Sequence, residues 1–268
     1  MNEKNQVMIS LKNVVKTFDG RLITDDISLD IYRGEIFVVM GCSGSGKSTL
    51  LRLMNGSIQP DSGDIYIKGK NIIGMSQNEL DELRKSFGMC FQYSALLDSL
   101  TVEENILLPL KEHTNMSQDI MNIIARMKLS LVGMGGFENY FPAELSGGMR
   151  KRVALARAIA LDPEIIFYDE PTSGLDPVVG AATDALIKDL SDKLKITSIV
   201  ITHNMQSVFK IADRVAMLYD GKLIEVGTPE EIRNSSNEYV RQFISGDSQG
   251  PINTASPGTQ MDFFKKVF

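Results

Sequence analysis

The chain has 268 residues, of which 43% are apolar and 23% are charged, so it can form one well-filled core with a subdomain or an extension. Its net charge of −6 argues against a nucleic-acid-binding protein, because such proteins present a basic surface to phosphates. The two cysteines, Cys42 and Cys90, are too few for a disulfide framework or a zinc site, and we expect reduced thiols. Residues 1–6 are polar and carry no signal region, and no apolar run reaches the roughly 18 residues that a membrane span needs.

An antiparallel pair of strands is predicted near the start of the chain. Alternating apolar residues indicate a strand over Met8–Phe18, and a second strand over Leu22–Ile31 follows the turn at Asp19 and Gly20. The sequence pattern leaves two interpretations of Phe18. Its ring could stack on the base of a nucleotide, or it could be one more aromatic residue of the core.

A phosphate-binding loop follows these strands. The motif G-x-x-x-x-G-K-[ST] is matched by Gly41-Cys42-Ser43-Gly44-Ser45-Gly46-Lys47-Ser48. A buried strand is predicted before the motif, over Ile36–Met40, and a helix after it, over Ser48–Met54. Glycines let backbone N–H groups turn toward phosphate oxygens, and the helix N-terminus adds partial positive charge. We therefore expect Lys47 to reach the β- and γ-phosphates and the Ser48 hydroxyl to ligate Mg²⁺.

A helical insertion is predicted between residues 93 and 150. A short apolar strand over Phe87–Phe91 places Gln92 at its end, and a capping box at Thr101 begins a helix that Pro109 is expected to bend or end. A second helix is predicted over Ser117–Leu129. We expect its apolar side chains to face the core, namely Ile120, Ile123, Ile124 and Met127.

A second glycine-rich segment begins the next helix and consists of Leu145-Ser146-Gly147-Gly148-Met149. A serine and two glycines before a helix are typical of an anion site, because free N–H groups and the helix dipole favour negative charge. An ordinary capped helix start is the alternative. The basic residues that follow are expected to form a solvated face, and they are Arg150, Lys151 and Arg152.

Two further strand ends carry polar residues. The buried strand of residues 164–168 ends in Asp169 and Glu170, and two carboxylates are costly there unless they have a function. In a phosphate-loop enzyme the first carboxylate orders Mg²⁺ and the second polarises the attacking water. The strand over Thr197–Thr202 places His203 at its end, where a sensor of the γ-phosphate is expected.

Together these motifs resemble the ATP-binding cassette (ABC) family in order and spacing, over about residues 9–227. The resemblance implies an α/β fold: a P-loop NTPase core with a parallel sheet, an N-terminal antiparallel β layer and a helical subdomain at about residues 93–150. It implies an ATPase that uses ATP and Mg²⁺, with the ring of Phe18 on the adenine. The residues implied to bind ATP are Phe18, Gly41, Cys42, Ser43, Gly44, Ser45, Gly46, Lys47, Ser48, Thr49, Ser146, Gly147, Gly148 and Asp176.

The same resemblance assigns the chemical roles. Glu170 is the expected general base, and Lys47, Gln92 and His203 are expected to stabilise the transferred phosphoryl group. The expected Mg²⁺ ligands are Ser48, Gln92 and Asp169. The signature segment, Ser146 to Gly148, lies too far along the insertion to reach its own phosphate loop. Family members therefore form head-to-tail dimers, in which this segment closes over the partner's γ-phosphate.

Finer features resemble the Mla-type ATPases, which energise phospholipid transport between the bacterial inner and outer membranes. These features are Met149 in place of the usual signature glutamine, residues 112–114, residues 157–163, and residues 240–243 followed by Gly250 and Pro251. The implied assembly joins two copies of this chain to two membrane permease subunits, on the cytoplasmic face of the inner membrane. Further implied partners are a STAS-domain regulator and a periplasmic lipid-binding subunit of the Mce type.

We divide the chain into an ABC nucleotide-binding domain, residues 1–245, and a C-terminal extension, residues 246–268. The extension cannot form a core by itself, yet it carries three phenylalanines, so it either docks on a partner or is an unstructured terminus. Two other functions fit the same motifs: the ATPase of another importer, such as one for amino acids, and a cassette ATPase of DNA repair or translation. The acidic balance and the single cassette disfavour the last of these.

Overall fold

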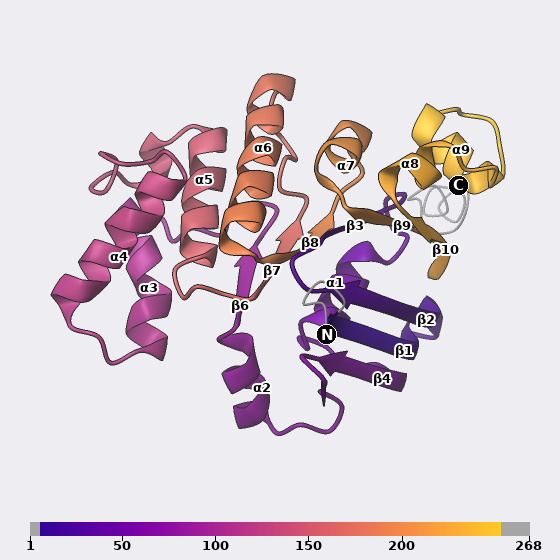
Figure 1. Ribbon diagram of the computed structural model, residues 1–268, viewed down its shortest axis with the longest axis horizontal. Coiled ribbons are helices and arrows are strands. Elements are labelled where there is room, and N and C mark those ends of the chain that lie inside the picture. The colour runs from indigo at the N-terminus through magenta and orange to yellow at the C-terminus, as the bar shows by residue number, and fades with distance from the viewer. Residues whose placement is uncertain (1–5, 253–268) are drawn as a thin grey trace, which may run out of the picture.

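The computed structural model describes residues 6–252 and shows an α/β fold with two sheets (Figure 1). The strands of the antiparallel sheet are β1 (Val7–Phe18), β2 (Arg21–Tyr32), β4 (Ser62–Ile67) and β5 (Lys70–Asn71). The strands of the larger sheet are β3 (Ile36–Met40), β6 (Phe87–Cys90), β7 (Ile165–Asp169), β8 (Thr197–Ile201), β9 (Arg214–Tyr219) and β10 (Lys222–Gly227). The helices are α1 (Lys47–Met54), α2 (Gln77–Arg84), α3 (Val102–His113), α4 (Gln118–Leu131), α5 (Gly147–Ala158), α6 (Pro177–Leu194), α7 (Met205–Ile211), α8 (Pro229–Arg233) and α9 (Glu238–Ser245).

The larger sheet has the strand order β10-β9-β3-β8-β7-β6, and its strands are parallel except at β10, which pairs antiparallel with β9. The smaller sheet has the order β2-β1-β4-β5 and pairs antiparallel throughout. The predicted N-terminal strand pair is therefore confirmed, as are the strand and helix that flank the phosphate loop. Of the helices in residues 6–252, none combines the length and the apolar character needed to cross a bilayer.

The parallel sheet is buried on both faces. Successive side chains of each strand point to opposite sides, and each side packs against its own core cluster. On β3, Ile36, Val38 and Met40 belong to one core cluster, and Phe37 and Val39 belong to the other. Helices α5, α6 and α7 cover the first face, while α1 fills the space between the second face and the antiparallel sheet (Figure 1). This arrangement places the residues at the carboxyl ends of β3, β6, β7 and β8 along one edge.

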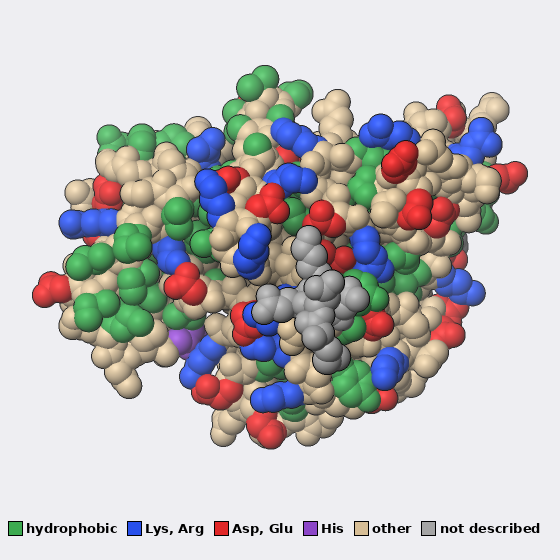
Figure 2. Space-filling model, viewed as in Figure 1, with side chains coloured by type: hydrophobic (Ala, Val, Ile, Leu, Met, Phe, Trp, Pro, Cys, Tyr) green, Lys and Arg blue, Asp and Glu red, His purple; other side chains and the backbone are tan. Residues whose placement is uncertain are grey.

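The predicted core face of α4 is wrong. Ile123 and Met127 are both 60% exposed and Ile120 is 50% exposed, although Ile124 packs partly against the core. The helix carries two apolar stripes, and the one that packs inward contains Met121, Ala125 and Leu129. Figure 2 shows apolar side chains gathered on the surface in the region of α4.

Pro109 does not end α3, which continues for four residues to His113. Proline removes one backbone hydrogen bond from a helix, and packing can outweigh that loss. Here Ile106, Leu107 and Leu110 are buried on both sides of Pro109, so the core holds the helix together across it.

Candidate functional site

The phosphate loop joins β3 to α1, and its fold depends on glycines. Gly41, Gly44 and Gly46 all have positive φ. A Cβ atom on Gly41 would lie 2.1 Å from the carbonyl oxygen of Leu218, and one on Gly46 would lie 2.7 Å from that of Ile23. Side chains at these two positions would therefore collide with backbone, and only glycine fits. Gly46 is the N-cap of α1, so the free N–H groups of the first helical turn are available to an anion.

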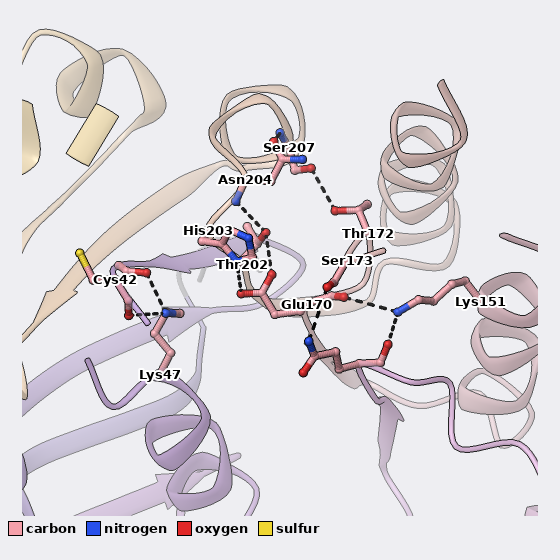
Figure 3. Close-up of polar contacts among 12 residues, drawn as sticks. Cys42, Lys47, Lys151, Glu170, Thr172, Ser173, Thr202, His203, Asn204 and Ser207 are labelled. Atoms are coloured by element: carbon pink, nitrogen blue, oxygen red, sulfur yellow. Dashed lines mark hydrogen bonds and ion pairs between the residues drawn. The ribbon is translucent and has the colours of Figure 1, made fainter. Parts of the chain in front are cut away.

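Lys47 lies across this loop. Its Nζ donates hydrogen bonds to the carbonyl oxygens of Gly41, at 2.7 Å, and Cys42, at 2.8 Å (Figure 3). The residue is only 8% exposed, and burial lowers the pKa of its ammonium, although the charge of Glu170 opposes that shift. A desolvated ammonium bonded to two neutral carbonyls can exchange them for a phosphate oxygen at little cost, because a charged acceptor binds it more strongly.

A cavity of about 720 Å³ opens beside the loop. The predicted site residues in its walls are Cys42, Ser43, Gly44, Gly46, Lys47, Ser48, Thr49, Gln92, Asp169, Glu170 and His203. The parallel topology brings these residues together from four separate parts of the sequence. The walls also include residues that no motif indicated, which are Arg21, Ile23, Ile201 and Phe243.

Asp169 and Glu170 stand at the end of β7, as predicted. Glu170 has φ 49°, in the left-handed region that is uncommon for a residue with a side chain. Its N–H donates to the carbonyl of Ile201 at 2.9 Å, which holds the residue against the end of β8. Burial, followed by repulsion from Glu170, raises the pKa of Asp169.

The carboxylate of Glu170 is held by two neighbours (Figure 3). Its Oε1 lies 2.8 Å from Nδ1 of His203, and its Oε2 accepts a hydrogen bond from the hydroxyl of Thr202 at 3.3 Å. The side chain of Glu170 is 13% exposed, while that of His203 is 65% exposed. A carboxylate in this position, oriented but still reached by solvent from one side, can accept a proton from a water molecule.

Gln92 and the basic residues after the signature segment are linked to this centre. Gln92 Nε2 lies 3.5 Å from the hydroxyl of Ser173, in the loop that follows Glu170. The solvated basic face predicted for Arg150, Lys151 and Arg152 is wrong for Lys151 and Arg152, which are half-buried, while Arg150 is exposed as predicted. Each of the three donates to a main-chain carbonyl. The acceptors are the carbonyl oxygens of Leu145, Gln92 and Val132, respectively.

Among the described residues, 6–252, no residue of the signature segment lines this cavity. Ser146 caps α5 by accepting a hydrogen bond from the N–H of Met149 at 3.3 Å, and Asp176 caps α6 by accepting from Val178 and Val179. Gly148 packs so closely on Val179 that a Cβ atom would lie 2.5 Å from its side chain. Ser146 and Gly147 are exposed. If this segment binds an anion, the anion is therefore not one held in the cavity of the same chain.

Three other predicted nucleotide residues also lie outside the walls of the cavity in the described part of the chain: Phe18, Gly41 and Ser45. Phe18, at the end of β1, is 44% exposed, and the ammonium of Lys16 lies 5.3 Å from its ring centre. Stacking of Phe18 on a base stays a prediction. Ser45 is buried, and its Oγ has no hydrogen-bond partner among residues 6–252.

The residues expected to hold Mg²⁺ fit a hard cation. Ser48, Gln92 and Asp169 all line the cavity, and each offers an oxygen, which is the donor that Mg²⁺ prefers. Within residues 6–252 there is no group of three or more His, Cys, Asp or Glu that could hold a metal by itself. In the usual mode of Mg²⁺ binding a few protein ligands act together with substrate phosphates, so a bound nucleotide would supply the remaining ligands.

Similarity to known proteins adds to this geometry. The family model of the ABC transporter matches residues 24–173. The intermembrane phospholipid transport system ATP-binding protein MlaF of Haemophilus influenzae is 41% identical over 98% of this chain and 99% of its own length. A probable ribonucleotide transport ATP-binding protein, mkl of Mycobacterium leprae, is 43% identical over 92% of this chain and 71% of its own length.

Among solved structures, the ATP-binding cassette MJ0796 in a dimeric post-hydrolysis state, bound to ADP and Pi, superimposes with a TM-score of 0.77 and 33% identity. The match covers 83% of this chain and 99% of that one. The cavity, the order of its motifs and these similarities agree. The chain belongs to the ABC transporter family and is an ATP-binding, ATP-hydrolysing subunit of that family.

Proposed function

We propose that this chain is the ATPase subunit of a bacterial phospholipid transporter that works between the inner and outer membranes. The observation that supports a phospholipid cargo is the 41% identity to the Haemophilus MlaF protein over 98% of this chain. That similarity covers 98% of this chain and 99% of the relative, whereas the general family model matches residues 24–173. The chain would act peripherally, on the cytoplasmic face of the inner membrane.

In the proposed mechanism, the N–H groups of the phosphate loop and the ammonium of Lys47 hold the β- and γ-phosphates of ATP. Glu170 accepts a proton from the attacking water, because its carboxylate is oriented by Thr202 and faces His203 at 2.8 Å. His203, on the exposed side, is placed to stabilise the charge that develops on the γ-phosphate. Mg²⁺ held by Ser48, Gln92 and Asp169 would neutralise charge on the phosphate oxygens.

The cavity provides half of the proposed site. The exposed Ser146 and Gly147 are at the N-terminus of α5, outside the cavity walls of the described chain. We propose that a second copy of this chain, placed head to tail, brings the same segment over the γ-phosphate, so that ATP closes the dimer and hydrolysis opens it. In this arrangement Asp176 would lie at the dimer interface.

A groove of about 430 Å³ beside Gln92 supports the proposed contact with a membrane permease. Its walls are mainly apolar and include Phe87, Met89, Phe91, Leu97, Leu108 and Pro109. Phe91 and Leu97 are partly exposed and Tyr93, next to Gln92, is 87% exposed. An apolar groove of this kind can receive one amphipathic helix of a partner. A STAS-domain regulator and a periplasmic Mce-type lipid-binding subunit complete the proposed assembly.

The cargo can be tested with the purified transporter. The chain, purified with the membrane partners that it retains, is placed in vesicles that contain a fluorescent phospholipid, and transfer to acceptor vesicles is followed with and without ATP. We expect ATP-dependent transfer that is lost in the Lys47→Ala variant. Partners that are identified by mass spectrometry as an amino-acid permease and its solute-binding protein, together with no lipid transfer, would contradict the proposed cargo and leave the ATPase assignment in place.

A further inference from the structure

Lys151 lies on the first turns of α5, five residues after Ser146, or about 7.5 Å along the helix axis. Its Nζ donates one hydrogen bond to the main-chain carbonyl of Gln92 and lies 3.5 Å from the main-chain carbonyl of Glu170 (Figure 3). One ammonium therefore contacts the backbone of two residues of the nucleotide cavity. Neither the family's signature nor the walls of that cavity include Lys151.

The contacts of Lys151 form part of a longer network. The side chain of Gln92 reaches Ser173 at 3.5 Å, and Ser173 follows Glu170 by three residues. The N–H of Ser173 donates to the carbonyl of Glu170 at 3.1 Å, the same oxygen that faces Lys151. The helix that carries the signature, the strand end at Gln92 and the turn after Glu170 thus meet at one side chain.

Lys151 carries its charge in a partly buried position, where a charge is costly without partners. Burial lowers the pKa of its ammonium, and the charges of Glu170 and Asp169 are among those that oppose that shift. Lys151 in turn is one of the cations that limit the rise in the pKa of Asp169. A half-buried lysine on a helix would normally extend into water, so its inward position needs the two carbonyls and the neighbouring carboxylates.

We propose that Lys151 is a positioning residue for ATP hydrolysis, which ties the backbone at Gln92 and Glu170 to the helix that bears the signature segment. When the N-terminus of α5 meets the nucleotide of the partner chain, the rigid helix carries that displacement to Lys151. Lys151 then sets the placement of Gln92 and Glu170 in the cavity of its own chain. This coupling rests on the proposed head-to-tail dimer.

The helix itself supplies a matched control. Arg152, the next residue, also spans a gap between elements, because its Nη1 donates to the carbonyl of Val132 at 3.2 Å. Val132 follows α4 in the helical region and lies outside the nucleotide cavity. Replacing Arg152 by methionine therefore removes a similar bond from the same helix while leaving the backbone at Gln92 and Glu170 untouched.

The test compares Lys151→Met, Lys151→Arg and Arg152→Met in the full-length chain, purified with its membrane partners and assayed below the melting temperature of every variant. We expect Lys151→Met to lower kcat by about tenfold or more, as removal of hydrogen bonds from a charged donor predicts, while KM for ATP stays within about twofold. Lys151→Arg retains a cationic donor and should recover most of the lost kcat. Arg152→Met should keep kcat within about twofold of the wild type, even where its melting temperature falls.

A kcat for Lys151→Met within about twofold of the wild type would overturn the inference, and so would an equal loss in Arg152→Met, which would indicate general destabilisation. A rise in KM without a fall in kcat would assign Lys151 to nucleotide binding and would equally overturn it. Failure of the proposed function, phospholipid transport, would give a different result from failure of the role proposed for Lys151. In that case the wild-type assembly itself, and not the Lys151 variants in particular, would lack ATP-dependent phospholipid transfer.

Discussion

Replacing Glu170 by glutamine should separate ATP binding from ATP hydrolysis. The substitution keeps the size and shape of the side chain and removes its ability to take a proton. Glutamine retains one carbonyl oxygen that can still accept the hydrogen bond from the Thr202 hydroxyl, which lies 3.3 Å from Glu170 in the wild type. The contact that changes most is the one with His203 at 2.8 Å, where a negative charge is lost.

The expected loss can be estimated from these contacts. A positioned general base typically contributes about 10²- to 10⁴-fold to the rate, which corresponds to about 3–5.5 kcal/mol of transition-state stabilisation. The free energy of unfolding should change by less than about 1 kcal/mol, because the side chain is isosteric and can keep a neutral hydrogen bond. Lys47 and the phosphate loop are untouched, so the affinity for ATP should stay within about threefold.

The assay measures phosphate release under saturating ATP, together with ATP binding and dimer formation by light scattering. We expect Glu170→Gln to bind ATP, to remain as an ATP-bound dimer and to release phosphate at least about a hundredfold more slowly than the wild type. Aspartate at the same position, which keeps the charge but withdraws it from His203, serves as a second variant. Hydrolysis by Glu170→Gln at the wild-type rate would remove Glu170 from its role as the base.

Three further predictions concern the scaffold around the site. Gly41→Ala places a Cβ atom 2.1 Å from the carbonyl oxygen of Leu218, so we expect a loss of about 1–3 kcal/mol in urea unfolding together with weaker ATP binding. Burial raises the pKa of Asp184, whose Oδ2 accepts from Ser207 at 2.8 Å while Oδ1 has no partner among residues 6–252. The folded state therefore binds a proton at Asp184 more tightly than the unfolded state, so the ionised carboxylate destabilises the fold. Asp184→Asn removes that charge and should stabilise the protein. This stabilisation should be fully present at about pH 8 and vanish as the pH falls toward about 4, which thermal melts can measure. Deleting residues 253–268, which spares the contact of Ile252 with Gln242, should weaken assembly with the permease on size exclusion without changing ATP affinity, and an unchanged yield of the complex would argue against a docking role.

The nucleotide cavity was largely predictable from the sequence because its motifs depend on local chemistry. Gly41 and Gly46 have backbone conformations and close contacts that exclude other residues, so the glycine pattern of the sequence predicts the phosphate loop. Asp169, Glu170 and His203 are polar residues at the ends of apolar strands, and parallel strands end at a common edge. These features need no knowledge of distant contacts.

Features that depend on distant contacts do not follow from local sequence patterns. Phe243 lines the cavity from α9, about two hundred residues after the phosphate loop, and no spacing rule connects the two. The apolar stripe with Ile123 and Met127 has the same helical period as the stripe that packs inward, so periodicity could not select the buried one. The inward position of Lys151 is unpredictable for a similar reason, because its acceptors are main-chain carbonyls, which every residue carries.

The C-terminal extension illustrates the same limit. Its first residues return to α9, where the N–H of Ile252 donates to Oε1 of Gln242 at 2.7 Å and Ile252 joins the buried core. Helix α9 ends at Ser245, with Gly246 in the left-handed conformation, and the division of the chain after residue 245 stays a prediction. The phenylalanines near the end of the chain lie outside the described residues, so their docking stays a prediction.

The central claim is that each ATP site is completed by a second chain, and mixing two inactive variants tests it most directly. Glu170→Gln lacks the base but presents an intact signature, while Ser146→Arg blocks the signature but keeps its own phosphate loop and Glu170. In a head-to-tail dimer, a mixed pair contains one fully intact site. Each variant alone should be inactive, and an equal mixture should recover about a quarter of the wild-type rate, because random pairing makes half the dimers mixed and each has one working site. Full activity of Ser146→Arg by itself, or a mixture as inactive as its components, would contradict the claim.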